Sequence, residues 1–270
     1  MMKEDNNITL IERLRRQLES NNNKQQFSRV YDEYNKYLLD NYPVTINKNT
    51  YLYRANVSTN PAKRFIVQYI LSGSNVLELG IGDGTLSAAL AHNNNDVIGI
   101  DVSSFAIDRA NLRFSHIQDL QFQHMDARWL QFPDQTFDYV IGLDVIGHLP
   151  FQDISDHIRE VKRVLKTNGS YFVWTVFRCM GENEDGLHLK VYSLRELTDL
   201  FHNIGFNVTL YDVRFIIFNA IFKILESCNG LVYWYEKLLS KTCLGRWFKN
   251  SRYSKWLIMP PCMIKARKIS

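Results

Sequence analysis

The chain has 270 residues and a mass of 31.7 kDa, and 46% of its residues are hydrophobic and 22% charged. This balance provides a core and excludes an intrinsically disordered protein. The net charge is +4, but residues 236–270 hold nine Lys and Arg against one acid. A basic end of this kind favours either contact with an anionic surface or a solvated basic face.

The number and spacing of the cysteines indicate the redox state of the compartment in which the protein works. The four cysteines (Cys179, Cys228, Cys243 and Cys262) include no Cys-x-x-Cys pair. Neither a disulfide scaffold nor a structural zinc site is therefore expected, and we predict a reducing, cytoplasmic location.

Two amphipathic helices are predicted at the start of the chain. Apolar residues fall on one helical stripe in each of them (Leu10, Ile11, Leu14 and Leu18; then Phe27, Val30, Tyr31, Tyr34 and Leu38). We expect residues 1–58 to form an N-terminal helical cover. A further helix is expected over residues 61–71, where Pro61 suits the first turn.

From residue 75 onward, short β-rich runs alternate with amphipathic helices. Strands are expected at residues 75–79, 96–100, 120–124, 137–143, 170–177, 206–213 and 261–268, and helices at 85–92, 104–114, 152–166 and 193–204. The last of these helices starts at a capping box, Ser193-Leu194-Arg195-Glu196. Regular alternation predicts an α/β fold with a doubly wound, mostly parallel sheet of seven strands, six parallel and the last antiparallel.

Residues 215–258 interrupt the alternation and predict a helical insertion, or cap, before the last strand. The remaining residues, 59–214 and 259–270, are then the core domain. The insertion mixes aromatic residues with Lys and Arg. We favour an apolar lid over a small-molecule pocket, and contact with a membrane surface, a homodimer face or nucleic acid are the alternatives.

A glycine-rich turn follows the first predicted strand. Gly80, Gly82 and Gly84 stand at alternate positions just before a helix. Such glycines permit a tight turn, and they let a ligand approach the backbone amides at the start of the helix. The next strand ends in Asp101, which lies about 20 residues past the first glycine, a spacing that suits a carboxylate for a ribose diol.

The same turn is compatible with a dinucleotide site, but two residues argue against it. The sixth position of the turn, which is glycine in the dinucleotide fingerprint, is Thr85. Glu78 precedes the turn, and a carboxylate beside a pyrophosphate costs on the order of a kcal/mol of Coulomb energy. The same carboxylate favours a cationic amine or sulfonium. The turn therefore indicates a zwitterionic or cationic ligand that carries an adenosine.

At these residues the sequence resembles the class I S-adenosylmethionine-dependent methyltransferases, which have a Rossmann-like fold. Glu78-x-Gly80-x-Gly82-x-Gly84 resembles the first motif of that family, and His124-Met125-Asp126-Ala127 resembles the next one. Residues 137–149 resemble the fourth strand with its substrate-facing end, and residues 165–169 resemble the turn before strand five, with Thr167 and Asn168 in place of Pro and Gly. The resemblance spans about residues 61–213.

The resemblance implies S-adenosylmethionine as the cofactor and names the residues that hold it. Asp101 corresponds to the ribose-binding acid, Asp126 to the acid that holds the adenine amino group, and the N–H of Ala127 faces the ring. The full set implied for the cofactor is Glu78, Gly80, Gly82, Asp101, Asp126, Ala127 and Leu143.

Methyl transfer to a hydroxyl or an acidic carbon needs a base, whereas transfer to a neutral amine does not. His148 follows the fourth strand and His188 lies in the loop after the fifth, so both are candidate bases, and packing is the alternative role for each. Tyr31 and Tyr34 are candidates for the acceptor pocket, with a place in the core as the alternative. Acids near His188 match no ligand motif, so no metal is predicted.

The sequence therefore predicts methyl transfer from S-adenosylmethionine to a small molecule, apolar or glycosylated, at oxygen, nitrogen or carbon. One rival is a nucleic-acid methyltransferase that uses the basic C-terminal segment. Amino-directed nucleic-acid methyltransferases of this fold use an Asn/Asp-Pro-Pro-aromatic motif, and the sequence lacks it. Its Pro260-Pro261 pair is preceded by Met259 rather than by Asn or Asp. A non-catalytic protein that retains the cofactor site and a nicotinamide dehydrogenase are the other rivals. The acceptor and the oligomeric state do not follow from the sequence.

Overall fold

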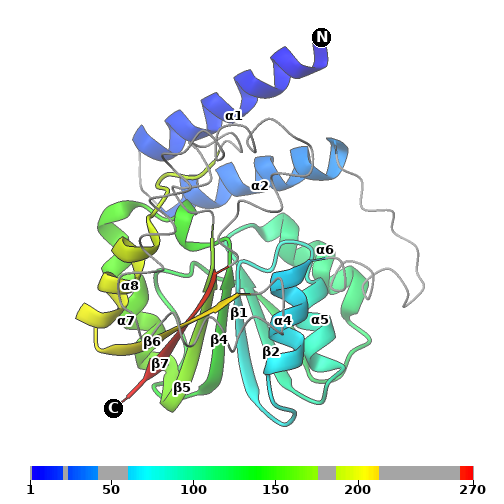
Figure 1. The fold of residues 1–270 in the computed structure, drawn as a ribbon. Coiled ribbons are helices and arrows are strands. Elements are labelled where there is room, and N and C mark those ends of the chain that lie inside the picture. Colours follow the sequence, from blue (N-terminus) through cyan, green and yellow to red (C-terminus); the bar gives the residue numbers. More distant parts are fainter. Residues whose placement is uncertain (1, 21–23, 42–59, 176–186, 213–261, 270) are drawn as a thin grey trace.

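A seven-stranded sheet forms the centre of the molecule in the computed structural model, which describes residues 2–20, 24–41, 60–175, 187–212 and 262–269 (Figure 1). The strand order is β3-β2-β1-β4-β5-β7-β6. The strands are β1 (Asn75–Leu79), β2 (Asp96–Asp101), β3 (Leu120–His124), β4 (Phe137–Leu143), β5 (Leu165–Trp174), β6 (Phe206–Asp212) and β7 (Cys262–Lys268). Strands β1 to β5 pair in parallel, and β7 runs antiparallel between β5 and β6. The predicted fold class is confirmed.

Helices cover both faces of the sheet. Helices α4 (Pro61–Tyr69), α5 (Thr85–Ala91) and α6 (Ser104–Phe114) lie on one face, and α7 (Ile154–Val164) and α8 (Leu194–Asn203) lie on the other (Figure 1). Consecutive residues of a strand point to opposite faces. Accordingly, Val76 is buried in the cluster that contains Phe65 of α4, and Leu77 in the cluster that contains Ile158 of α7.

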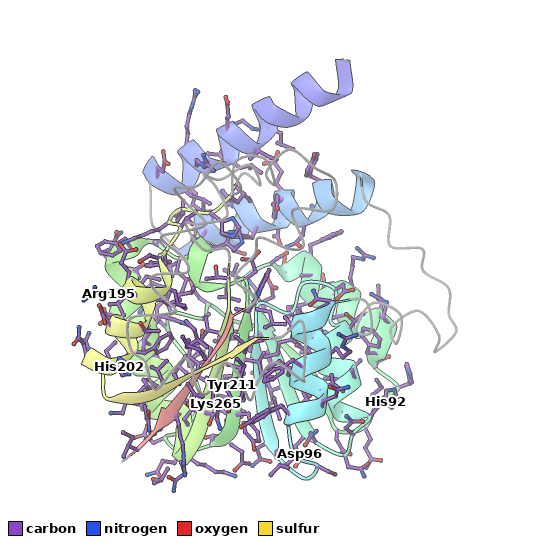
Figure 2. The ribbon with its side chains drawn as sticks, viewed as in Figure 1. His92, Asp96, Arg195, His202, Tyr211 and Lys265 are labelled. Atoms are coloured by element: carbon purple, nitrogen blue, oxygen red, sulfur yellow. The ribbon has the colours of Figure 1, made fainter. Side chains whose placement is uncertain are left out.

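Strands β7 and β6, at one end of the sheet, are bound to α4 by polar contacts. Lys265 of β7 donates a hydrogen bond to the Tyr69 hydroxyl over 2.8 Å, and the hydroxyls of Tyr69 and Tyr211 lie 3.4 Å apart. Lys265 and Tyr211 lie near each other on these strands (Figure 2). The antiparallel end of the sheet is therefore attached to the same face that carries α5 and α6.

The N-terminal helices α1 (Met2–Ser20) and α2 (Lys24–Asn41) lie across the carboxyl ends of the parallel strands (Figure 1). Leu14, Leu18, Phe27 and Val30 are buried in the same cluster as Ile146, which follows β4. These residues of the predicted apolar stripes thus pack against the core at this edge, and residues 2–20 and 24–41 form the two helices that the sequence predicts.

The start of β5 differs from the expectation. The sequence predicts a turn at residues 165–169 and a strand from residue 170, but the strand already begins at Leu165, which is buried and pairs with Phe137. Asn168 adopts a φ of +66°, and the register with β4 shifts between Phe137 and Tyr139. A left-handed residue accommodates such an irregularity, so the pairing continues where a turn was predicted.

The predicted insertion at residues 215–258, with its aromatic and basic residues, lies outside the described residues, and the division into domains stays a prediction. The flanking residues are described. Asp212 at the end of β6 pairs with Cys262 at the start of β7. The chain therefore leaves and re-enters the sheet at the edge that α2 covers. No helix among the described residues has the length and apolar character that crossing a membrane requires.

Candidate active site

A cavity of about 220 Å³ opens at the carboxyl ends of the strands beneath α2. It lies at the point where the strand order reverses, between β1 and β4, which is the usual ligand position in open α/β sheets. Its walls come from the loops after four strands and from α2 (Phe27, Tyr31, Tyr34, Asn35, Gly80, Gly82, Ile100, Asp101, Val102, Met125, Asp126, Ala127, Leu143, Asp144, Val145, His148 and Leu149). Nine of the predicted site residues are in this set, and Glu78 and His188 are not.

The glycine-rich turn after β1 has the backbone conformation that its sequence predicts. Gly80, Gly82 and Gly84 have φ values of +66°, +54° and +71°. A Cβ added at Gly80 would lie 2.7 Å from a methyl carbon of Val145, so the close approach of the two loops excludes a side chain there. The amide of Gly80 donates to the Ile100 carbonyl over 2.8 Å, which joins the turn to β2.

The loop is also held from the α4 side. Lys63 Nζ lies 3.3 Å from Asp83 Oδ1 and 3.0 Å from Thr85 Oγ1. Asp83 Oδ1 in turn accepts a hydrogen bond from the Thr85 amide over 3.2 Å. Asp83 therefore stabilises the start of α5.

Glu78 lies behind the turn rather than in the cavity wall. Its carboxylate is 3% exposed and accepts a hydrogen bond from Ser87 of α5. Burial raises the pKa of Glu78 to about 7. A cation bound at the adjacent turn would favour the ionised form of this group.

Asp101 forms the wall after β2. Its Oδ1 accepts the Ser103 amide over 2.9 Å and its Oδ2 accepts the Gly82 amide over 3.2 Å. Burial raises the pKa of Asp101 to about 6. Each carboxylate oxygen keeps acceptor capacity, so a diol can bind there.

Asp126 lines the cavity after β3, and it is ion-paired. Arg128 donates from Nη2 to Asp126 Oδ2 over 2.7 Å and from Nε to Oδ1 over 3.0 Å, and both side chains are about 1% exposed. Arg128 also donates to Asp153 over 2.7 Å. Sequence reasoning missed Arg128, because arginine is rarely buried and nothing in the local pattern marks it.

The backbone of the same loop is held by His157 of α7. His157 Nδ1 lies 2.7 Å from the Ala127 carbonyl oxygen, and its Nε2 lies 3.0 Å from the Tyr171 hydroxyl. A carbonyl only accepts, so Nδ1 carries the proton and Nε2 accepts from Tyr171. Burial lowers the pKa of His157 and keeps the ring neutral. This residue had no sequence signal either.

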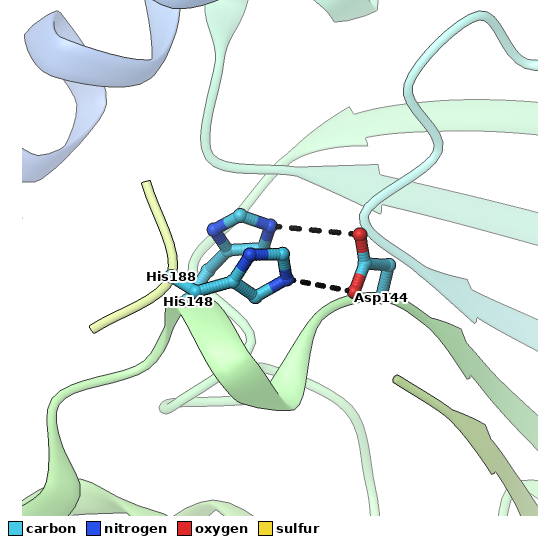
Figure 3. A group of neighbouring side chains, drawn as sticks. All are labelled: Asp144, His148 and His188. Carbon is cyan, nitrogen blue, oxygen red and sulfur yellow. Dashed lines mark hydrogen bonds and ion pairs between the residues drawn. The ribbon is translucent and has the colours of Figure 1, made fainter. Parts of the chain in front are cut away.

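Asp144, His148 and His188 come together, as Figure 3 shows, and the first two of them line the cavity. Asp144 follows β4 with a φ of +62°. Its Oδ1 lies 2.9 Å from His188 Nε2, and its Oδ2 lies 3.9 Å from His148 Nε2. The two rings stack, with centroids 4.3 Å apart and planes at 20°. A Cβ added at Gly147 would lie 2.6 Å from the His188 ring, so glycine is required for this packing.

The hydrogen bonds separate the roles of the two histidines. Although burial opposes it, the hydrogen bond from His188 and the nearby imidazoles lower the pKa of Asp144. An ionised carboxylate only accepts, so His188 Nε2 carries a proton and donates it to Asp144. His148 Nδ1 lies 3.2 Å from the Leu187 carbonyl oxygen, which also only accepts. Nδ1 of His148 is therefore protonated, and its Nε2 keeps a free lone pair.

Two acceptors thus face each other across 3.9 Å, His148 Nε2 and Asp144 Oδ2. A donor group beside this gap can hydrogen-bond to either atom, and a hydroxyl, which has one hydrogen, donates to one of them. Burial lowers the pKa of His148, against the attraction of Asp144, so the ring is neutral near pH 7. The three side chains each offer a potential metal ligand within 4.8 Å of the others, but the rings are stacked, so their lone pairs run side by side rather than converging.

Tyr31 combines the two roles that the sequence left open. Its side chain is 8% exposed within the core cluster, and it also lines the cavity. Its hydroxyl donates to the His148 carbonyl oxygen over 3.4 Å, and its ring meets the His148 ring edge-on at 5.8 Å. Tyr34 lies in the wall of the cavity and packs against the same cluster. Helix α2 therefore roofs the site.

The chemistry of this cavity fits S-adenosylmethionine. Three carboxylates, Asp101, Asp126 and Asp144, line it, a fourth, Glu78, lies behind the glycine turn, and none of the lining residues that the structure describes is Lys or Arg. Such a site favours a cationic nucleoside and disfavours the pyrophosphate of a nicotinamide cofactor. The close approach at Gly80 and the diol-binding position of Asp101 agree with this ligand.

Comparisons with known proteins agree. Residues 76–169 match the family model described as a methyltransferase domain. The chain is 33% identical over 122 residues to a ubiquinone biosynthesis O-methyltransferase of Coxiella burnetii, covering 44% of this chain and 51% of the relative. It is 32% identical over 120 residues to a phosphatidylethanolamine N-methyltransferase of Cereibacter sphaeroides, covering 43% and 58%. The chain thus spans about half the length of the curated relatives it matches.

Among solved structures, the [4+2]-cyclase SpnF aligns with a TM-score of 0.58 and 18% identity, over 91% of this chain and 96% of that one. At this identity the likeness shows a shared fold. Residues 76–169 are therefore similar to a methyltransferase domain, and this matched segment carries the glycine-rich turn and the acids around it.

Proposed function

We propose that the protein transfers the methyl group of S-adenosylmethionine to a small-molecule acceptor that has an apolar body and a hydroxyl as its nucleophile. The supporting observation is the free lone pair on His148 Nε2 in the wall of the cavity, opposite Asp144. Apolar and aromatic side chains around it, Phe27, Val145 and Leu149, suit an apolar acceptor. The matched relatives are named as an O-methyltransferase of ubiquinone biosynthesis and an N-methyltransferase of phosphatidylethanolamine.

In this proposal the cofactor is held by the residues that the family resemblance implies. The Gly80–Gly82 turn and Glu78 hold its methionine end, Asp101 the ribose, and Asp126 with Ala127 the adenine, and Leu143 lines the same cavity. When bound, the cofactor supplies an electrophilic methyl group with a neutral thioether as leaving group. The apolar roof formed by α2 excludes water and aligns the acceptor, which is the main contribution a protein makes to such a displacement.

His148 serves as the base in this proposal. As the acceptor oxygen forms its bond to the methyl carbon, the hydroxyl proton moves to His148 Nε2, and it is later released to solvent. Asp144 stabilises the imidazolium that results. His188 donates to Asp144 and is a positioning residue, so the two histidines that the sequence left equal acquire different roles.

The test is transfer of a labelled methyl group, with S-adenosylhomocysteine as the measured product, to a panel of hydroxylated aromatic and aminoalkyl acceptors. His148→Gln should lower kcat/KM for a hydroxyl acceptor by about 10²- to 10⁴-fold, with the cofactor Kd unchanged. His92→Gln is the control, because His92 is exposed and lies away from α2 (Figure 2). Full turnover of a hydroxyl acceptor by His148→Gln would refute the base.

A chelator should leave the rate unchanged. A loss that a divalent ion restores would instead assign Asp144, His148 and His188 as metal ligands. Product formation is required because SpnF, a protein with this fold, is named as a cyclase. Cofactor binding without any turnover would favour a non-catalytic protein, and a salt-dependent gel shift would favour a nucleic-acid acceptor.

We further propose a cytoplasmic location, from the cysteine content, and a cap formed by residues 215–258 over the acceptor. Membrane contact or a homodimer through the basic, aromatic segment is tested by vesicle flotation and by sedimentation. The cap, the membrane contact and the homodimer all concern residues outside those that the structure describes.

A further inference from the structure

Helix α2 is connected to both cofactor-binding acids through single intermediate residues. At the ribose side, the carboxylate of Asp32 accepts the Ser103 hydroxyl over 2.8 Å and the Phe105 amide over 3.1 Å. The amide of Ser103 donates to Asp101. At the adenine side, the ring of Phe27 lies 4.4 Å from the guanidinium carbon of Arg128, which holds Asp126.

Arg128 has an unusual environment for a charged residue. Its side chain is 1% exposed, and its guanidinium carbon lies 4.4 Å from the centroid of the Phe27 ring of α2 and 4.5 Å from that of the Trp129 ring. Asp126 and Asp153 accept its hydrogen bonds in the plane of the group. Only a planar group with several fixed donors can stack on two rings and bind two carboxylates at once, so lysine cannot replace it here.

The hydrogen bonds from Arg128 also determine where the Asp126 carboxylate can accept a hydrogen bond from a ligand. Its Oδ1 accepts the amide of Arg128 over 2.9 Å and the Nε over 3.0 Å, which occupies both lone pairs. Its Oδ2 accepts Nη2 over 2.7 Å and shares the single Nε hydrogen with Oδ1, at the longer distance of 3.2 Å. The second acceptor direction of Oδ2 is therefore the weakest occupied one, and an amino donor can bind there.

We propose that Arg128 is a positioning residue of the cofactor site, which orients the Asp126 carboxylate toward the exocyclic amino group of the nucleoside and couples cofactor binding to the seating of α2. The proposal rests on the cofactor site and needs no transfer to any acceptor. Its failure is therefore distinguishable from failure of the proposed reaction.

Calorimetry with the full chain tests the orientation. S-adenosylhomocysteine and S-inosylhomocysteine, which carries a carbonyl in place of the amino group, serve as the two probes. The wild-type protein should prefer the adenosyl compound. Arg128→Lys should raise the Kd for the adenosyl compound by about 10-fold and remove most of the preference, because the carboxylate is no longer oriented.

Arg163→Lys is the matched control. Arg163 also binds this loop, at the carbonyl oxygens of Leu130 and Phe132 over 2.8 and 2.7 Å, and it contacts neither Asp126 nor Phe27 in the described structure. Its substitution should lower the melting temperature and leave the nucleoside preference intact. An equal loss of affinity for both probes in the two variants would reduce Arg128 to a structural residue and overturn the proposal.

Two measurements on α2 test the coupling, including the case in which Arg128→Lys does not fold. In the wild-type protein the cofactor should slow amide hydrogen exchange in residues 24–41. Phe27→Leu should raise the cofactor Kd several-fold, and in a double-mutant cycle its effect should shrink in the Arg128→Lys background. Exchange in α2 that is indifferent to the cofactor, together with an unchanged Kd for Phe27→Leu, would refute the coupling.

Discussion

At the residue scale, the site depends on acids whose ionisation is linked to the ligand. Glu78 is buried, hydrogen-bonded to Ser87 and next to the glycine-rich turn, to which we assign the methionine end of the cofactor. Burial raises the pKa of Glu78 to about 7, well above its ordinary value of 4.5. Because its folded pKa is raised, Glu78 stabilises the fold below about pH 4.5, and this contribution is lost as the pH rises through 7.

A cationic cofactor reverses this dependence, because it favours ionised Glu78. We expect the cofactor Kd to decrease as the pH rises from 6 to 8, with proton release on binding below pH 7. Calorimetry in buffers of different ionisation enthalpy measures both. In Glu78→Gln the proton release should be smaller and the remaining pH dependence should be centred near 6, the pKa of Asp101. An unchanged pH profile in Glu78→Gln would show that Glu78 is not linked to the ligand.

At the element scale, the short 3-10 helix η1 (Ile146–His148) determines where the two histidines meet. The Gly147 carbonyl accepts the amides of Leu189 and Lys190 over 2.9 and 3.2 Å, and the His188 ring packs on its Cα. The loop that follows β5 is thereby attached to the loop that follows β4. The stacked pair depends on this contact.

Gly147→Ala should therefore lower kcat by about 10-fold or more, because a Cβ would displace the His188 ring by a few tenths of an ångström or more from Asp144. The cofactor Kd should not change, since Asp101 and Asp126, the acids assigned to the cofactor, lie on other loops. Gly205→Ala is the control for stability. Gly205 has a φ of +87° at the end of α8, outside the cavity lining, so its substitution should cost about 1–2 kcal/mol without affecting kcat. Equal kcat losses in both variants would contradict the assignment.

At the scale of the whole molecule, the cover formed by α1 and α2 is both a part of the core and the roof of the cavity. Leu14 and Leu18 are buried in the same cluster as Leu79 and Ile146, at the carboxyl edge of the sheet. By contrast, the ion pair between Arg13 and Glu33 that joins α1 to α2 is largely exposed. Apolar burial, rather than surface charge, therefore holds the roof in place.

Leu18→Ala should cost about 2–5 kcal/mol in the free energy of unfolding and raise the acceptor KM, because the roof loosens. Arg13→Ala, in the same helix, should change stability by about 1 kcal/mol or less and leave KM unchanged. Thermal denaturation and steady-state kinetics measure these effects. A fall in stability without any change in KM would show that α1 does not contribute to the acceptor site.

The sequence by itself determined the order of the elements and the cofactor end of the site. The helical stripes, the alternating strands and the capping box at Ser193 depend on neighbouring residues, and all three are present in the structure. The glycine turn and Asp101 were also predictable, because strand ends of a parallel sheet meet at one edge.

Only the tertiary structure decided the roles that depend on partners far along the chain. Arg128 joins the loop after β3 to Asp153, and His157 of α7 binds the Ala127 carbonyl oxygen of the same loop. His148 and His188 differ through their contacts with Leu187 and Asp144. Periodicity assigns a side chain to a face, but it does not determine which donor meets which acceptor. That choice follows from loop conformations and close contacts such as Gly147 against His188, which form when the sheet is assembled.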